Sequence, residues 1–244
     1  MAQQSGNPAL KNKAFQSTAS VGSQSMSMAG VSLKSFFLLL LCLAGAGFGW
    51  SMALQAANSL WLILTIASIG GLIIGLITSF NPRIAWATGP LYALTQGYIL
   101  GVISFLANLE FPGIVIQAVL LTLCIFMVTL FVYATGIIKV TRKFVFGVII
   151  ATAGVALYYL AYLIIGLFGI ELPLVNSNSP WGIAFSVLIV IIASLNLILD
   201  FDFIKNAVQQ RVPKFLEWYA AFSLIVTLLW LYVEVLRLLG KSRR

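Results

Sequence analysis

Residues 113–136 read GIVIQAVLLTLCIFMVTLFVYATG, a continuous run without a single charged side chain. A helix needs about 20 predominantly apolar residues to cross roughly 30 Å of hydrocarbon, and this run is long enough. A strand of a transmembrane barrel would instead alternate apolar and polar residues, which this run does not do. The stretch therefore predicts a membrane-spanning helix.

Six further stretches of the chain have the same continuous apolar character. They are separated by turn-forming dipeptides, among them Asn81-Pro82, Phe111-Pro112 and Val212-Pro213. The seven predicted spans are residues 35–54, 59–80, 88–107, 113–136, 144–169, 180–201 and 215–239. Because each span satisfies its backbone hydrogen bonds internally only as a helix, the sequence predicts an all-α integral membrane protein with seven transmembrane helices.

The composition supports this fold class and excludes several kinds of chemistry. Of the 244 residues, 61% are hydrophobic and 8% are charged, whereas a soluble domain carries about 25% charged residues. The chain has no histidine, the commonest metal ligand and general base, and Cys42 and Cys124 both lie inside apolar runs. No nucleophile lies beside a base in any recognisable arrangement. We expect neither an enzyme nor a bound cofactor.

The chain divides into three parts by composition. Residues 1–32 are polar and rich in Ser, Gln and Gly, and such a segment is expected to form a disordered tail. Residues 33–240 form the predicted transmembrane domain, and residues 241–244 form a short basic C-terminal tail.

The basic residues predict the orientation in the membrane. The connections at 55–58, 108–112 and 170–179 contain no lysine or arginine and carry Glu110 and Glu171. The other set, including the N-terminal tail, contains Lys11, Lys13, Lys34, Arg83, Lys139, Arg142, Lys143, Lys205, Arg211 and Lys214. Basic connections stay on the cytoplasmic side, so the N-terminus is predicted to be cytoplasmic. Seven crossings would place the basic C-terminal tail outside; alternatively, the last segment is re-entrant and returns.

Glycines recur at close spacing in several predicted spans. Small residues let transmembrane helices approach closely, so helix–helix packing is the favoured interpretation, and a ligand path lined by glycine backbone is the alternative. These glycines are Gly45, Gly47, Gly70, Gly71, Gly75, Gly97 and Gly101.

Four of the six acidic residues lie in or beside the last two spans: Asp200, Asp202, Glu217 and Glu234. A carboxyl group in hydrocarbon is costly unless it is paired, protonated or in contact with water, so it is a functional candidate by default. The alternative for Asp202 and Glu217 is that they are solvated helix ends.

Antiparallel packing of the last two spans gives the relative depth of these residues. Glu217 lies about 6 Å from the level of Asp202 and about 9 Å from that of Asp200, so Glu217 is the favoured partner of the aspartates. Glu234 has Arg237 three residues later, which favours a local ion pair. Carboxyl groups held close together in a low dielectric cannot all be ionised, which suggests a proton-sensitive latch or a cation site. Arg83 is the basic candidate to close such a latch.

Several motifs resemble the Bax-inhibitor family, and the opening NPAL at 7–10 is similar to a bacterial branch of it. The other motifs are LYALTQGYILG at 91–101, ILDFDFI at 198–204, EWYAAF at 217–222 and LYVEVLRLL at 231–239. The resemblance covers essentially the whole chain. It implies a seven-helix bundle with the last helix central and a pH-sensitive calcium leak across the membrane.

The resemblance also implies a sensor made of two aspartates on the last two helices, with an arginine at the end of the second helix. Asp200 matches the first aspartate and Arg83 matches the arginine. For the second aspartate, alignment on the LYVEVLRLL motif gives Glu234, and alignment on its arginine gives Thr227. Glu217 fits the second sensor position by its predicted depth in the membrane and not by a motif. The resemblance further implies that Asp200 would contact calcium as the transported ion.

The sequence thus predicts a pH-sensitive channel or transporter for calcium or other cations in the bacterial inner membrane. The alternative is a non-transporting membrane protein that modulates a membrane protease or a stress response. The expected partners are the lipid bilayer, cations and, in the second case, a membrane protease; a nucleic acid is not expected.

Overall fold

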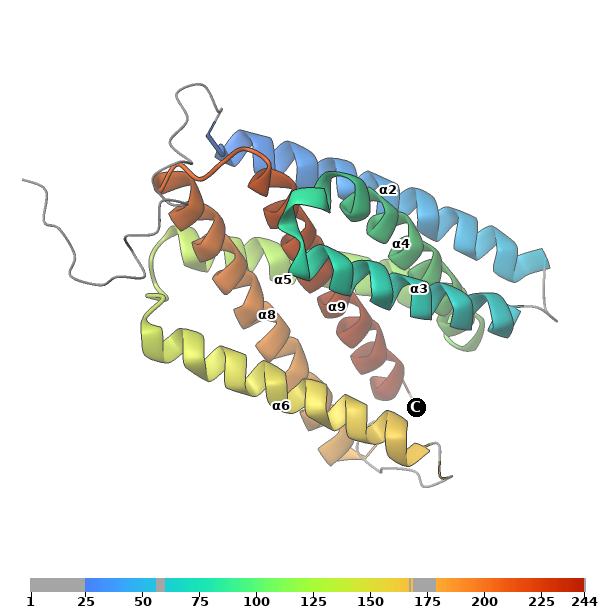
Figure 1. The fold of residues 1–244 in the computed structure, drawn as a ribbon. Helices are drawn as coiled ribbons and strands as arrows, with labels where there is room; N and C mark the ends of the chain where they lie inside the picture. The colour runs from blue at the N-terminus through green and yellow to red at the C-terminus, as the bar shows by residue number, and fades with distance from the viewer. Residues whose placement is uncertain (1–24, 56–59, 167, 169–178, 244) are drawn as a thin grey trace, which may run out of the picture.

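The computed structural model describes residues 25–55, 60–166, 168 and 179–243, and Figure 1 shows the helices in this part of the chain. They are α2 (Met28–Gln55), α3 (Leu60–Phe80), α4 (Ala85–Glu110), α5 (Ile114–Ala134), α6 (Arg142–Gly166), α8 (Pro180–Gln209) and α9 (Leu216–Ser242). A short 3₁₀ turn, η2 (Pro82–Ile84), precedes α4. Within the described residues, seven helices are long and apolar enough to cross a membrane, and no β-strand is present. The predicted fold class is confirmed.

The helix ends follow the turn signals of the sequence. Gly113 and Gly136 have φ angles of 80° and 71°, which glycine adopts at no steric cost. The Ser179 side chain caps α8 by accepting a hydrogen bond from the backbone N–H of Gly182. Such caps satisfy backbone groups that have no partner inside the helix, so they fix where the spans begin and end.

Two boundaries differ from the sequence prediction. Helix α2 begins at Met28, so residues 28–32 form its first turn and do not belong to a disordered tail. Residues 1–24 lie outside the described part of the chain. Helix α9 continues to Ser242, so the first residues assigned to the basic C-terminal tail are helical.

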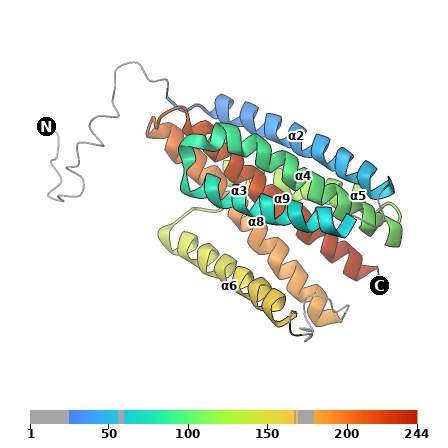
Figure 2. The same cartoon turned by 45° about the vertical axis from the view of Figure 1, so that its right-hand side comes forward.

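Successive helices run in opposite directions through the bundle (Figures 1 and 2). The start of α2 and the end of α9 therefore lie at opposite ends. Helix α9 is one continuous helix, so the last segment crosses the bundle and is not re-entrant. It packs against α2, α4, α5 and α8.

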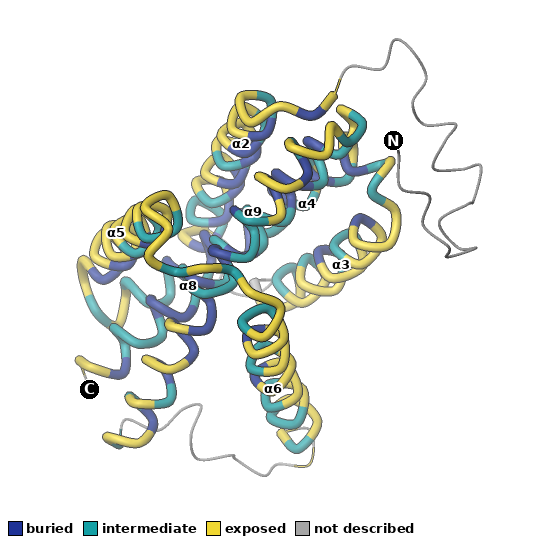
Figure 3. Tube along the Cα trace, turned by 90° about the vertical axis from the view of Figure 1, so that its left-hand side faces the viewer, coloured by how far each residue is buried: buried dark blue, intermediate teal, exposed yellow. Residues whose placement is uncertain are grey.

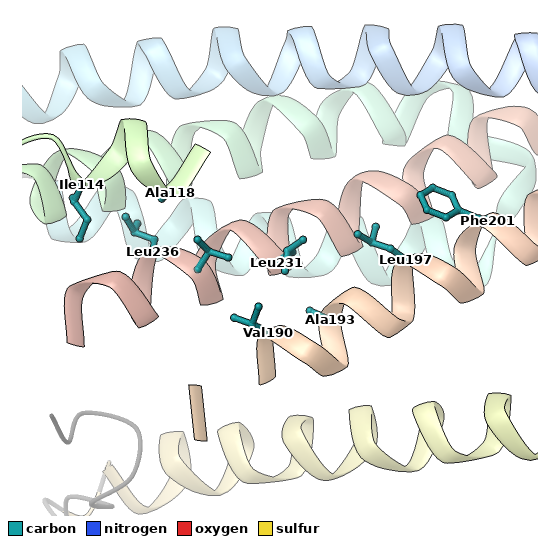
Figure 4. Packing of buried hydrophobic residues seen from close by; sticks show 9 residues of the cluster. Ile114, Ala118, Val190, Ala193, Leu197, Phe201, Leu231 and Leu236 are labelled. Carbon is teal, nitrogen blue, oxygen red and sulfur yellow. The ribbon is translucent and has the colours of Figure 1, made fainter. Parts of the chain in front are cut away.

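The largest apolar cluster joins α5, α8 and α9 (Figure 4). Leu197 of α8 and Leu231 and Val235 of α9 are completely buried there, and Ile114 and Ala118 close the cluster from α5. Burying such side chains stabilises the native state by roughly 1.5–3 kcal/mol each in water, but in lipid the gain comes from tight packing. This cluster holds α8 and α9 side by side.

Close contact between α2 and α4 depends on glycines of both helices. A Cβ at Gly97 or Gly101 of α4 would collide with the backbone of Cys42 or Ala46 of α2. A Cβ at Gly45 of α2 would likewise collide with the backbone of Leu94 in α4. The packing interpretation is therefore confirmed for these three glycines.

Helices α3 and α6 lie at the periphery, with much of their surface exposed (Figure 3). Helix α6 packs on α8, where its Val155 joins Ile189 and Ile192 in a small apolar cluster. The Asn196 side chain also donates a hydrogen bond of 2.7 Å to the Thr152 hydroxyl. Only Val148 and Val155 of α6 are buried among the described residues, so each polar contact to this helix matters more for holding it in place.

Candidate functional site

Asp200 lies on α8, more than two turns before the helix ends, and faces α9. The Ser223 hydroxyl of α9 donates a hydrogen bond of 2.8 Å to its Oδ1. The Thr227 hydroxyl, one turn further on, donates to the Ser223 carbonyl oxygen at 3.3 Å. The other oxygen, Oδ2, is buried and has no hydrogen-bond partner among the described residues. In hydrocarbon such an oxygen requires a proton, a cation or a water molecule.

Asp202, two residues later, has a different environment. Its Oδ1 accepts a hydrogen bond of 3.3 Å from the Tyr133 hydroxyl of α5. Its Oδ2 accepts one of 2.7 Å from the Asn206 amide, one turn along α8. Both oxygens of Asp202 therefore have a hydrogen-bond donor, and the bond to Tyr133 connects α8 to α5.

Glu217 is completely buried in the first turn of α9 and is ion-paired with Lys34 of α2. Its Oε1 also accepts hydrogen bonds from the backbone N–H and the hydroxyl of Ser27, at 2.9 and 3.1 Å. A Cβ at Gly30 would collide with this carboxylate. The start of α2 is therefore shaped around Glu217.

The residues before α2 form a strap, Ser25–Ser27, that lies on the turn between α8 and α9. The Met26 N–H donates to the Val212 carbonyl oxygen at 2.8 Å, and Ser25 forms an isolated antiparallel bridge with Pro213. The Met26 side chain is buried in a cluster with residues of α8 and α9. The strap thus fixes the start of α2 to the last hairpin of the bundle.

Glu234 lies in the second half of α9 and is 1% exposed. It is ion-paired with Arg237 at 3.2 Å, which confirms the predicted local pair. The Tyr159 hydroxyl of α6 lies 2.9 and 3.1 Å from its two oxygens, and Arg237 contacts the same hydroxyl. The Trp230 indole N–H donates a hydrogen bond of 3.3 Å to Glu234 Oε1. This group is the polar link between α6 and α9.

The four predicted acidic residues do not form one cluster. Neither Glu217 nor Glu234 bonds to Asp200, whose hydrogen-bond donor on α9 is the Ser223 hydroxyl. The depth argument for Glu217 is therefore not supported, because its carboxylate turns toward α2. The hydrogen bond that Asp200 accepts from α9 comes from Ser223, which neither alignment for the second sensor position gives, so that position stays a prediction.

Arg83 does not form the predicted latch in the structure. It lies in η2, and its side chain is exposed. The ion pairs in the described part of the chain join Lys34 to Glu217 and Arg237 to Glu234, and none joins Arg83 to Asp200. At this end of the bundle the basic residue that pairs with a buried carboxylate is Lys34, and its partner is Glu217 and not Asp200.

Sequence reasoning missed Lys34, Ser223 and Tyr159 as partners of the acidic residues. In the sequence Lys34 is one of the basic residues that indicate orientation, but a lysine just inside a span also needs a partner or the interface. Ser223 and Tyr159 are neutral and carry no charge signal. Hydroxyl groups on helix faces at the depth of a buried acid are the signal that could have found them.

The basic residues near the end of α9 are held by protein groups. The Lys241 ammonium donates to the Gly182 carbonyl oxygen at 3.1 Å and to the Ser186 hydroxyl at 2.9 Å. The Arg243 guanidinium donates to the Gln117 amide oxygen at 2.7 Å. Arg244 lies outside the described residues.

A preformed metal centre is not found in the described part of the chain, where no three Cys, Asp or Glu side chains are placed to hold an ion. Calcium takes six to eight oxygen ligands. At Asp200 the described residues supply one carboxylate, with the Ser223 hydroxyl beside it.

A comparison with protein families finds that the profile described as "Bax inhibitor 1 like" matches residues 7–244. No match is found among curated proteins or among solved structures. The match spans nearly the whole chain, including every helix from α2 to α9 that the structure describes.

Proposed function

Because this chain belongs to the Bax inhibitor 1 like family of membrane proteins, we propose that it is a pH-sensitive leak channel or transporter for cations, with calcium as the favoured ion. The proposed location is the bacterial inner membrane, with the N-terminus in the cytoplasm. The proposal rests on one observation above the others: Asp200 carries a buried carboxylate oxygen without a partner among the described residues.

The surroundings of Asp200 suggest how protonation would act. When ionised, the carboxylate has one donor, the Ser223 hydroxyl, and its second oxygen attracts a cation or water toward the contact between α8 and α9. When protonated, the group is neutral and hydrocarbon tolerates it. Acidification would therefore change both the attraction for cations and the packing of the last two helices.

Calcium flux into vesicles containing the purified protein, measured over a series of pH values, tests this function. Asp200→Asn removes the titrating group at nearly constant shape, so the pH dependence should become flat. Ser223→Ala removes the donor to the ionised form, so the midpoint should move to higher pH while the response remains.

Asp202→Asn is the matched control, because it makes the same change two residues away at a carboxylate whose oxygens both have donors. It should keep the parental pH curve. If Asp200→Asn keeps that curve and Asp202→Asn flattens it, Asp200 is not the sensor.

The alternative, a non-transporting partner of a membrane protease, is favoured by a different observation. The two other buried carboxylates are paired within the protein, Glu217 with Lys34 and Glu234 with Arg237, and the clusters between the helices are apolar. A transport path would have few polar groups besides Asp200. If the folded protein moves no cation at any pH, the leak function is excluded and the partner function is favoured.

A further inference from the structure

A cavity of about 370 Å³ lies among α2, α4, α5 and α9, away from Asp200. Almost all of its surface comes from apolar side chains and glycine. On α2, the lining extends from Leu39 to Trp50, which corresponds to about 16 Å along the helix axis at 1.5 Å per residue. The cavity is therefore elongated in the direction of the spans.

The floor and the mouth of the cavity can be distinguished by exposure. Cys42, Leu100 and Leu229 line the floor and are buried. Leu43 of α2 and Leu123 of α5 also line the cavity, yet they are 57% and 45% exposed on the outside of the bundle. The cavity therefore opens between α2 and α5 toward the surface that the bilayer covers.

The few polar groups in the lining already have partners. The Ser104 and Tyr232 hydroxyls hydrogen-bond to each other at 2.7 Å, and the Thr122 hydroxyl donates to the Ala118 carbonyl oxygen at 2.7 Å. A buried water needs two to four polar partners, and apolar cavities without them stay dry or bind apolar molecules. Water and ions are therefore poor occupants of this space.

Gly47 shows that the space is not required by the packing of the protein. A Cβ at Gly47 would have no atom within 4 Å, whereas one at Gly45 or Gly49 would collide with the backbone of α4. Gly47 lines the cavity, and glycine is the poorest helix former after proline. Because Gly47 has no side chain, the cavity is wider at this point. Unlike Gly45 and Gly49, Gly47 is not needed for the close approach of α2 and α4.

We propose that this cavity is a binding site for one acyl chain of a membrane phospholipid, which enters from the bilayer between α2 and α5. The long apolar shape, the satisfied hydroxyls and the mouth on the lipid-covered surface all fit a hydrocarbon chain. The site is separate from Asp200, so it does not depend on the proposed leak activity.

Photolabelling of the full chain in bilayer nanodiscs tests the proposal. The probe is a phosphatidylcholine with a diazirine in the middle of one acyl chain, and adducts are mapped by mass spectrometry. The two cysteines provide an internal comparison, since Cys42 is buried in the floor and Cys124 is exposed on α5. Adducts at both positions are expected, because the probe reaches the floor as well as the outer surface.

Gly47→Leu should fill the cavity and reduce the Cys42 adduct several-fold, while the Cys124 adduct stays unchanged. Gly70→Leu on α3 is the matched control, because Gly70 also faces open space but does not line the cavity. It should change neither adduct.

Two results would overturn the proposal. The first is labelling of Cys124 without labelling of Cys42 in the parent protein, which requires no variant to fold. The second is an unchanged Cys42 adduct in a Gly47→Leu protein that elutes and melts like the parent.

Discussion

Lys34 and Glu217 form an ion pair although they lie 183 residues apart in the chain. The pair joins the start of α2 to the start of α9, and the Ser27 donors complete the shell of the carboxylate. Glu217 is fully buried and the Lys34 side chain is 17% exposed. The last helix is thereby fixed to the first described one.

Lys34→Met should destabilise the protein strongly, because it leaves a buried carboxylate without its counter-charge. Loss of one partner of a buried pair typically costs about 3–5 kcal/mol. Unfolding of the detergent-solubilised protein measures the change. Arg83→Met is the control, since Arg83 is an exposed basic residue at the same end of the bundle, and such surface changes usually stay within about 0.5 kcal/mol. Equal losses in both variants would mean that the pairing with Glu217 is not the cause.

Tyr159→Phe should loosen α6 from the bundle. It removes the hydroxyl that bonds to Glu234, and a hydrogen bond to a charged group is worth about 1.5–3 kcal/mol. Hydrogen–deuterium exchange should rise in α6 and stay unchanged in α2. Tyr158→Phe is the control, because Tyr158 contacts Phe185 through its ring. Faster exchange in α6 for both variants would point to ring packing instead of the Glu234 contact.

Gly97→Val should separate α2 from α4, since its Cβ would meet the Cys42 backbone. Overpacking costs about 1–3 kcal/mol when side chains can adjust, and a backbone contact gives way less easily. Gly70→Val places the same side chain into open space on α3 and should leave the melting temperature nearly unchanged. A Gly97→Val protein as stable as the Gly70→Val protein would show that the close approach is not needed.

Cysteine labelling in sealed, oriented vesicles tests the predicted orientation, with Cys42 and Cys124 first replaced. A cysteine at Arg211, in the turn before α9, should react only with reagent on the cytoplasmic side. Pro112→Cys, at an exposed position in the turn before α5, should react only from the opposite side. The reverse pattern would place the N-terminus outside.

The seven helices could be predicted because a span needs only length and apolar composition, and both are local properties of the sequence. The Glu234–Arg237 pair could be predicted for the same reason, since residues three apart face each other on a helix. The contacts of Glu217 could not. Depth arithmetic treats two helices as parallel rods and gives the level of a residue but not its rotation about the axis. By this arithmetic Asp202 and Glu217 lie about 6 Å apart in depth, yet the Asp202 carboxylate bonds to Tyr133 and that of Glu217 to Lys34.

The strap Ser25–Ser27 and Lys34 are synthesised long before the residue that they hold. At about 5–20 residues per second, roughly 10–40 s separate the synthesis of Lys34 from that of Glu217. During that time α2 carries a lysine just inside the span without its counter-charge. Contacts between residues so distant in the chain form late, because the intervening loop must first be closed. The start of α2 is therefore completed only when α9 arrives, and a chain that stops before α9 leaves α2 without these contacts.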